Sequence, residues 1–324
     1  MASSSKRFHM KAAADETTGF GTNSSLFGDR LIKKDGRPNL SKTGLPFFER
    51  LSWYHTLIEL STSRFLLVIL FVFLFFNLLF ALFYFFIGVD HLGGMIATTK
   101  TEQFIEAYFF SAQTFTTVGY GRINPTGYLT SMVAAIEAFS GLLFFAIATG
   151  LFYARFSRPQ AFIRFSDKAL LTPFKGGIAF MFRMVPYKNN ALTDAEVKVT
   201  IGMVVNENGN DMIRFYPMEL EISRINALTL SWTIVHPINE KSPLHNLSKE
   251  DLIRTRAEVL VYLKAFDDTF SNTVVARSSY TAEELIVGAK FLPMYHRSMQ
   301  GKYTVLEIDK LNTFEKADLP EVTK

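Results

Sequence analysis

The sequence contains no cysteine, which excludes disulfide bonds and thiolate metal sites. A large excess of charge of either sign is also lacking, since the sequence has 34 Lys and Arg and 30 Asp and Glu, which gives a net charge of +4. No basic stripe interleaved with aromatic residues occurs in the polar part, so we expect no nucleic-acid partner. The charged start, short apolar core and small-residue cleavage site of a signal peptide are missing too.

Catalytic patterns are missing from the polar part of the chain after Gln160. There is no metal-ligand spacing, no GxSxG nucleophile turn and no phosphate-binding loop. His236, His245 and His296 are scattered, and we interpret them as structural histidines and not as metal ligands. We therefore expect no enzyme and no cofactor.

Phenylalanine is abundant, with 33 residues that lie mostly in two apolar blocks. Phe65 to Ile87 is a run of 23 residues in which Asn77 is the only strongly polar side chain. Such a run is long enough to cross a hydrocarbon core of about 30 Å. A second apolar run follows after a turn cluster. The sequence therefore predicts two transmembrane helices, 64–87 and 129–156.

Between these two spans, a short amphipathic segment (102–114) leads directly into Thr117, Val118, Gly119, Tyr120 and Gly121. The string TVGYG is a known signature of potassium-channel selectivity filters, so its assignment is a motif match. We expect a re-entrant pore helix followed by an extended loop, because non-helical backbone at membrane depth must be enclosed or line a watery path.

Four copies of this loop would turn backbone carbonyls toward a common axis and replace the hydration shell of K⁺. The two glycines can take positive φ, which lets the strand alternate without a Cβ penalty. The Thr117 hydroxyl would add one more oxygen, while Val118 and Tyr120 would point away from the axis and pack on the surrounding helices. Since the chain has no internal repeat, four chains are required, and K⁺ at the filter is the only metal ion expected.

The second span carries aromatic residues at helical spacing. Phe145 and Phe152 share a face, with Thr149 and Tyr153 close beside it. On a water-filled cavity they would form rings that dewet and close the path. Alternatively, they face lipid, and periodicity alone does not separate the two interpretations.

Three further residues of this span are functional candidates. Gly141 and Gly150 mark places where the helix could bend or pack closely on a neighbour. Glu137 is the one carboxylate within a span, where acids usually face protein or water. It either lines the cavity or braces the filter from behind. We favour the brace, because Glu137 lies about 80° around the helix from Phe145 at 100° per residue.

Positive charge sets the expected orientation. Residues 1–64 hold ten Lys or Arg, whereas the loop 88–128 holds only Lys100 and Arg122, so both termini are expected in the cytoplasm. Arg64, Arg155 and Arg158 would lie at headgroup depth, where they either attract anionic phospholipids or only set the topology. We expect residues 1–45 to be disordered and residues 46–62 to form an amphipathic interfacial helix.

From Gln160 onward, short β-rich runs are separated by Pro, Gly and Asn–Asp turns. One helix is expected near residues 248–256, with Ser248 as its N-cap. This pattern predicts an antiparallel β-sandwich over 159–310, followed by a tail at 311–324. The eight expected strands are Ala161–Phe165, Ile178–Val185, Val197–Val205, Met212–Ile222, Leu228–Val235, Val259–Phe266, Thr273–Tyr280 and Tyr303–Ile308.

Two further motifs carry a family resemblance, YARFSRP at 153–159 and LSWTIVHPI at 230–238, the latter followed by SPL at 242–244. With the order of helix, two spans, filter and β-domain, the chain resembles the inward-rectifier potassium channels, especially their prokaryotic KirBac-like members, over residues 47–308. The resemblance implies a homotetramer with immunoglobulin-like cytoplasmic domains, and anionic lipid near Arg155 and Arg158. It also implies a gating aromatic at Tyr153 and a cavity constriction at Phe145.

The chain departs from eukaryotic members of that family at three places. Phe145 stands where strong rectifiers carry an acid, and the cysteines around the filter loop are missing. Gln113 replaces a filter-supporting glutamate, which leaves open how this filter is braced. The resulting hypothesis is a potassium-selective channel of the plasma membrane that conducts passively and is gated near Tyr153. The alternative is a membrane-anchored sensor or binding protein whose β-domain is the active part.

Overall fold

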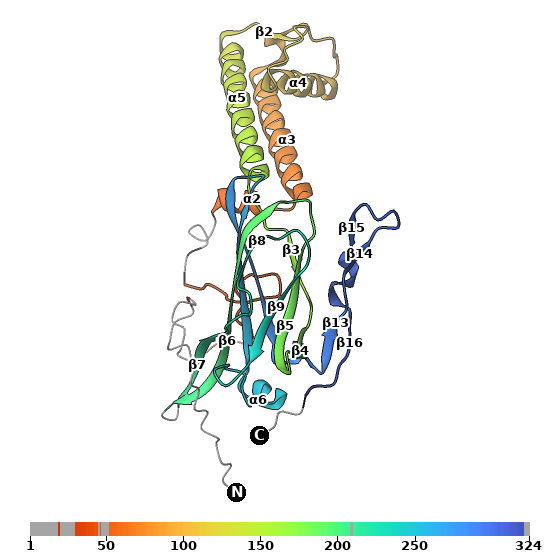
Figure 1. The fold of residues 1–324 in the computed structure, drawn as a ribbon. Coiled ribbons are helices and arrows are strands. Elements are labelled where there is room, and N and C mark those ends of the chain that lie inside the picture. The colour runs from red at the N-terminus through yellow and green to blue at the C-terminus, as the bar shows by residue number, and fades with distance from the viewer. Residues whose placement is uncertain (1–18, 20–29, 45, 47–51, 208–209, 321–324) are drawn as a thin grey trace. The chain divides into compact units, whose positions relative to one another are not determined.

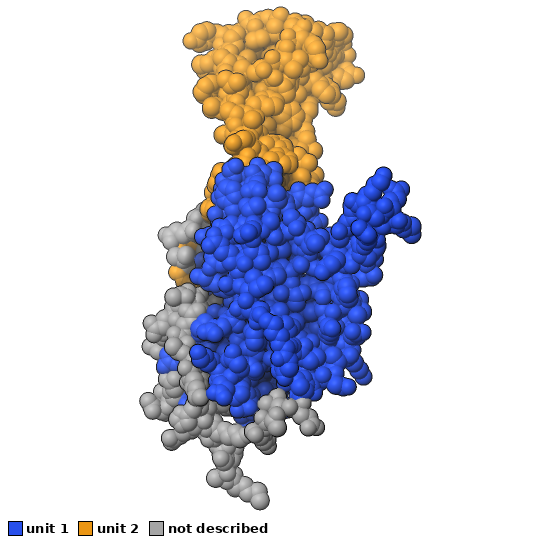
Figure 2. Space-filling view, in the orientation of Figure 1, with its two compact units in different colours: residues 1–42, 159–324 blue, residues 43–158 orange. Residues whose placement is uncertain are grey.

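The computed structural model describes residue 19 and residues 30–44, 46, 52–207 and 210–320. These residues belong to two compact units, a helical unit (43–158) and a β unit (1–42 with 159–324), which are coloured separately in Figure 2. The first part of the expected interfacial helix (47–51) and most of the expected disordered segment lie outside the described residues.

Among its described residues, the helical unit contains a short helix, two long helices and a helix of intermediate length between the long ones (Figure 1). Both long helices are long and apolar enough to cross a membrane. The helices are α2 (Trp53–Glu59), α3 (Thr62–Ile87), α4 (Lys100–Phe115) and α5 (Tyr128–Phe156). The helices α3, α4 and α5 begin and end within two residues of the predicted bounds, whereas the interfacial helix, predicted over residues 46–62, covers only Trp53–Glu59 among the described residues.

Local sequence explains how α4 begins. Thr99 is its N-cap, and its hydroxyl accepts a hydrogen bond from the Glu102 amide, while the Glu102 side chain bonds back to Thr99. This capping box satisfies two amides that would otherwise lack a partner at the helix start. Beyond α4, a two-residue strand pair joins β1 (Leu92–Gly93) to β2 (Asn124–Pro125), so the segment before the pore helix pairs with the segment after the filter.

The β unit contains two five-stranded sheets that enclose one apolar core. One sheet has the order β11-β10-β6-β7, with β8 also paired to β6, and the other has the order β12-β4-β5-β3, with β9 also paired to β5. The strands of the first sheet are β6 (Leu192–Glu207), β7 (Asn210–Pro217), β8 (Arg224–Ala227), β10 (Glu258–Asp267) and β11 (Asn272–Thr281). Those of the second are β3 (Ile163–Phe165), β4 (Ala169–Phe174), β5 (Gly177–Pro186), β9 (Trp232–Ile238) and β12 (Leu285–Val287).

The core lies between these two sheets. Phe182 on β5, Val199 on β6 and Leu263 on β10 are all buried in it, which is the arrangement of a β-sandwich. Ser248 caps the short helix α6 (Lys249–Arg254), as predicted. One strand pair differs from the expectation of a purely antiparallel fold, because β12 runs parallel to β4.

The expectation of disorder was wrong for the end of the N-terminal segment. Residues 30–39 fold back on themselves through a bridge between Ile32 and Pro38. The carboxylate of Glu258 accepts hydrogen bonds from the backbone amides of Leu31 (2.6 Å) and Ile32 (3.1 Å), and both apolar side chains are buried. A two-residue apolar pair has no periodicity, so the sequence alone offered no signal for this attachment.

The C-terminal segment is also more structured than expected. Two hairpin pairs follow the sandwich, β13 (Ala289–Phe291) with β16 (Phe314–Lys316), and β14 (Tyr295–Arg297) with β15 (Thr304–Leu306). Leu311, in the short 3₁₀ helix η3 (Ile308–Asn312), is buried beside Val185 and Met294. Residues 311–316 are therefore part of the β unit and not a tail.

Candidate selectivity filter and its support

The filter segment begins where α4 ends. The Thr117 amide donates to the Thr114 carbonyl (3.0 Å), and the amides of Val118 and Gly119 both donate to the Gln113 carbonyl (3.0 and 3.3 Å). The inner end of the segment is therefore tied to the last turn of the pore helix. The C-terminal end of a helix carries partial negative charge, which favours a cation close to it.

The backbone of this segment alternates in the sign of φ. Gly119 and Gly121 have φ of 54° and 85°, in the left-handed region that glycine adopts without a Cβ penalty. Thr117 also has a positive φ, of 58°, which was not predicted and is uncommon for a side chain branched at Cβ. Three alternate residues of the segment, Thr117, Gly119 and Gly121, therefore take the left-handed conformation.

The side chains of Val118 and Tyr120 are uncovered within one chain. Val118 is 53% exposed and Tyr120 is 80% exposed. An added Cβ on Gly119 or Gly121 would meet no atom within 4 Å. The expected packing of Val118 and Tyr120 on surrounding helices is thus not provided by the described residues of the same chain.

Glu137 joins three helices of the unit, α3, α4 and α5. Its two carboxylate oxygens each lie 2.5 Å from a hydroxyl, Oε1 from Ser111 on α4 and Oε2 from Tyr84 on α3. Ser111 Oγ also lies 3.1 Å from the carbonyl of Asn77. All four side chains are completely buried. The carboxylate can therefore act as a polar joint between the pore helix and both long helices.

Sequence reasoning singled out Glu137 but missed its partners Ser111 and Tyr84. A usable signal existed, because a buried carboxylate needs donors and Ser111 is one of the few hydroxyls on the pore helix. Glu106 and Arg122, which form an ion pair at 2.8 Å, were missed as well.

The two glycines of α5 lie in different surroundings. A Cβ added to Gly141 would come within 1.9 Å of the Phe115 carbonyl oxygen, so the α5 backbone presses on the end of the pore helix. Gly150 has open space around it. Of the two possibilities raised for these glycines, close packing describes Gly141, and only Gly150 is free to serve in a bend.

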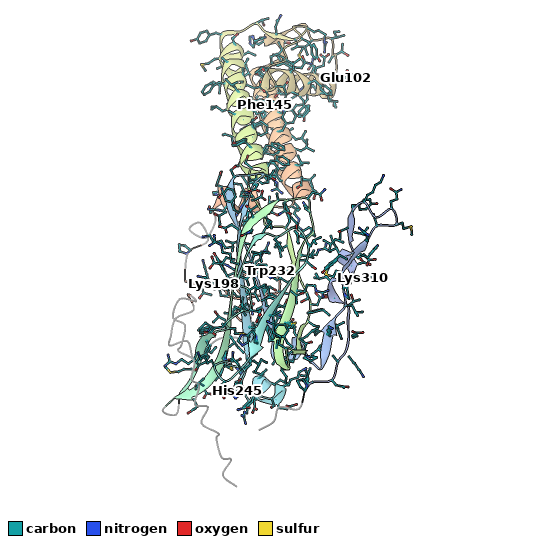
Figure 3. All side chains as sticks on the ribbon, in the orientation of Figure 1. Glu102, Phe145, Lys198, Trp232, His245 and Lys310 are labelled. Atoms are coloured by element: carbon teal, nitrogen blue, oxygen red, sulfur yellow. The ribbon has the colours of Figure 1, made fainter. Side chains whose placement is uncertain are left out.

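The aromatic residues of α5 separate into two sets. Phe145, labelled on α5 in Figure 3, is 45% exposed, and Tyr153 is 75% exposed. Thr149 is exposed between them. Phe152 instead packs edge-to-face on Phe65 of α3, with ring centroids 5.0 Å apart. Phe152 therefore packs within the helical unit, whereas Phe145 stays exposed on α5.

The three candidate lipid-contacting arginines also differ. Arg155 donates to the carbonyls of Ile58 (3.0 Å) and Leu57 (3.4 Å) near the end of α2, and its guanidinium lies 5.2 Å from the Phe65 ring centroid. Arg64 and Arg158 are exposed. Arg155 is thus engaged in holding α2, whereas Arg64 and Arg158 are accessible in this chain.

No group of three metal-ligating side chains is found among the residues that the structure describes. His236 is buried, with Nδ1 at 2.6 Å from the Glu219 carbonyl and Nε2 at 2.7 Å from Ser242 Oγ. Burial lowers the pKa of His236, so the ring is neutral. These contacts agree with a structural role for this histidine.

Comparison with known families divides the chain at the same place as the fold. Residues 66–158 match the family described as "Ion channel", and residues 163–324 match "Inward rectifier potassium channel C-terminal domain".

Among individual relatives, "Inward rectifier potassium channel Kirbac3.1" of Paramagnetospirillum magnetotacticum is 32% identical over 84% of this chain and 92% of its own length. "Inward rectifier potassium channel irk-1" of Caenorhabditis elegans is 26% identical over 85% of this chain, but over only 55% of its own length. "G protein-activated inward rectifier potassium channel 2" of Pongo abelii is 26% identical over 82% of this chain and 67% of its own length.

Two spans with a TVGYG loop between them, a β-sandwich after them in the sequence and these matches lead to one conclusion: the chain belongs to the inward rectifier potassium channel family and is an ion channel, not an enzyme.

Proposed function

We propose that four copies of the chain surround one conduction path, and that the backbone carbonyls of residues 117–121 replace the hydration shell of a passing K⁺. The observation that carries this proposal is the geometry of the filter segment. It leaves the end of the pore helix with positive φ at three alternate residues and is uncovered within one chain. A segment so exposed at the centre of a membrane unit needs further copies to enclose it.

The gate of this path is formed by Tyr153 and Phe145, with Thr149 between them on the exposed face of α5. Four copies of these bulky side chains would form rings narrow enough to exclude water. Phe152 takes no part, because it is packed on Phe65. Gly150, which is not pressed by any neighbour in the chain, is the place where α5 bends.

The channel lies in a plasma membrane with both termini in the cytoplasm, an orientation supported by the many basic residues before α3 and the few between the spans. Anionic phospholipids modulate it through Arg64 and Arg158, whose guanidinium groups are accessible. Arg155 contributes by holding α2 in place, since its Nη1 already donates to the α2 carbonyls.

Flux of K⁺ and of Na⁺ into liposomes that contain the purified full-length chain tests the function directly. We expect K⁺ flux that exceeds Na⁺ flux by a large factor. An assembled tetramer that passes no K⁺ in any lipid mixture would overturn the proposal and favour the membrane-anchored sensor.

The gate and the lipid contact are tested in the same assay. Tyr153→Ala should raise resting K⁺ flux, with Phe139→Ala, also exposed on α5, as the matched control. Arg158→Gln should change the dose curve for anionic lipid, whereas Arg155→Gln should alter flux similarly in neutral and anionic membranes. Unchanged flux for Tyr153→Ala, or identical dose curves for Arg158→Gln, would remove that residue from its assigned role.

A further inference from the structure

Two buried oxygen atoms at one end of the β unit have no hydrogen-bond partner in the described part of the chain. They are Oδ2 of Asp267, at the end of β10, and Oδ1 of Asn190, in the connection between β5 and β6. Asp267 is completely buried. Its other oxygen, Oδ1, accepts hydrogen bonds from the amides of Thr269 (2.9 Å) and Phe270 (3.3 Å) in the connection between β10 and β11.

Both side chains lie on the core side of the first sheet. β6 and β10 are antiparallel, and Leu192 is the residue directly opposite Asp267. Directly opposite residues of an antiparallel pair lie on the same face, and Leu192 is buried in the core, so Asp267 is on that face too. Asn190 precedes Leu192 by two residues, and its Nδ2 donates to the carbonyl of Ala161 (2.9 Å), another residue of this core.

Hydrogen bonds beyond the strand ends bring the two side chains together. The Asp268 amide donates to the Ala191 carbonyl (3.1 Å), so the pairing of β6 with β10 continues one residue beyond their ends. One further step puts Asn190 opposite Thr269. The Asp267 carboxylate is turned toward this same residue, because its Oδ1 accepts the Thr269 amide. The two unpartnered oxygens therefore belong to one small region between the two connections.

The chemistry of this region favours a cation. A buried carboxylate oxygen without a donor is costly, and proteins compensate such charge with an ion pair or a metal ion. The basic side chains next to the two residues in sequence are directed elsewhere, since Lys188 Nζ lies 3.9 Å from the Phe162 ring centroid and Lys264 is exposed. A bridging water would donate to both oxygens but would leave the charge uncompensated. A cation satisfies both oxygens and the charge.

We propose that Asp267 and Asn190 bind a Ca²⁺ ion that joins the β5–β6 connection to the β10–β11 connection. Carboxylate and amide oxygens suit this hard cation, and its flexible coordination accepts an irregular set completed by main-chain carbonyls and water. Mg²⁺ demands octahedral geometry and retains several waters, for which a completely buried carboxylate leaves little room. A site of one carboxylate and one amide differs from a cluster of three acidic or histidine side chains, which is not found among the described residues.

The test measures thermal unfolding and Ca²⁺ binding of the purified full-length chain after treatment with EDTA. Addition of about 1 mM CaCl₂ should raise the melting temperature by on the order of 5 °C, because the ion binds the folded state and not the unfolded one. The same concentration of MgCl₂ or KCl should have little effect. Equilibrium dialysis should find about one Ca²⁺ ion per chain, as one site per chain requires.

Three variants assign the ion to this site. Asp267→Asn should abolish the Ca²⁺-dependent shift and still fold, because its new amide group can donate to the Asn190 oxygen. Asn190→Asp should raise the Ca²⁺ affinity by about tenfold, since a second carboxylate adds negative charge. The matched control is Asp268→Asn, which should keep the shift, because the Asp268 carboxylate accepts a hydrogen bond from Thr193 Oγ1 (2.9 Å) instead.

Several outcomes would overturn the inference. A wild-type chain that binds no Ca²⁺, or that responds equally to MgCl₂ or KCl, contains no Ca²⁺ site of this kind. A full shift in Asp267→Asn would mean that the ion binds elsewhere. If Asp267→Asn does not fold, Asn190→Asp decides, because an unchanged Ca²⁺ affinity in that variant would exclude the site.

Discussion

Both units bury polar side chains, but the helical unit leaves many large apolar side chains exposed, whereas the β unit buries most of its own between two sheets. In the helical unit, Asn77, Ser111 and Glu137 are completely buried, while Phe71 and Phe86 are 69% and 80% exposed. In the β unit, Phe182 and Leu263 are completely buried, and the core is an apolar cluster between two sheets. Exposed phenylalanine rings are unfavourable in water but not in lipid. The difference therefore indicates that the helical unit is surrounded by lipid and the β unit by water.

The comparison also shows where buried charge is used. In the β unit, Glu258 and Arg183 are buried, and both hold segments that lie outside the two sheets. The carboxylate of Glu258 accepts hydrogen bonds from the amides of Leu31 and Ile32, and Arg183 donates a hydrogen bond to the carbonyl of Leu292 (2.8 Å). In the helical unit, the buried carboxylate of Glu137 joins helices. In both units, buried polar groups form directional hydrogen bonds between separate elements, which fix their relative positions more specifically than apolar packing does.

The largest expected effect tests the contrast directly. Phe182→Ala should destabilise the β unit by about 4 kcal/mol, because it empties a well-packed core. Phe86→Ala, on the exposed face of α3, should cost under about 1 kcal/mol, because the phenyl ring contacts surrounding lipid or detergent. Thermal unfolding of the purified full-length chain measures both. Equal losses would mean that the exposed face of α3 is covered by protein.

A second pair of substitutions compares two glycines within one helix. Gly141→Ala should cost about 3 kcal/mol, since the added methyl group would collide with the Phe115 carbonyl and displace α5 from the pore helix. Gly150→Ala should stabilise α5 by up to about 1 kcal/mol, because alanine favours helix and nothing obstructs the methyl group. Recovery of assembled channel after heating distinguishes them. Equal tolerance at both positions would contradict the close contact of α5 with α4.

The buried polar joint of the helical unit should be less costly to remove. Glu137→Ala leaves the hydroxyls of Ser111 and Tyr84 without their acceptor, which should cost about 2 kcal/mol. The control is Ser140→Ala, one turn along the same helix, where the hydroxyl bonds only the Ile136 carbonyl of its own helix. Thermal unfolding should show little change for the control. A loss as large in Ser140→Ala would show that the effect is not specific to the joint.

The smallest expected effect is a pH dependence in the β unit. Burial lowers the pKa of His236 in the folded state, so the unfolded chain binds a proton more readily. Stability should therefore be full above the unfolded pKa of about 6.5 and fall as the pH drops below it.

This pH dependence is measured as the difference in melting temperature between pH 7.5 and 5.5. His236→Gln should reduce the difference, whereas His296→Gln, at an exposed position, should preserve it. An unchanged difference in His236→Gln would assign the acid sensitivity to other groups.

Much of the architecture follows from runs and motifs that are local in the sequence. Two apolar runs predicted α3 and α5, the TVGYG string predicted a filter after the short helix between them, and alternating β-rich runs predicted the sandwich. Even the start of α6 was predictable, because Ser248 caps it by contacts within four residues. Such features are set by backbone conformation and local hydrogen bonds, which neighbouring residues decide.

Tertiary structure alone decided which partner each functional side chain meets. Periodicity placed Phe145 and Phe152 on one face of a helix, but the ring of Phe65 takes Phe152 out of that set. The charge pattern predicted that Arg155 lies at a membrane surface. In the structure its guanidinium instead donates to carbonyls of α2, nearly a hundred residues earlier in the chain. The attachment of Leu31 to Glu258 likewise joins residues far apart in sequence. The reason is physical: a sequence pattern specifies which face a side chain occupies, whereas its partner depends on how distant elements pack.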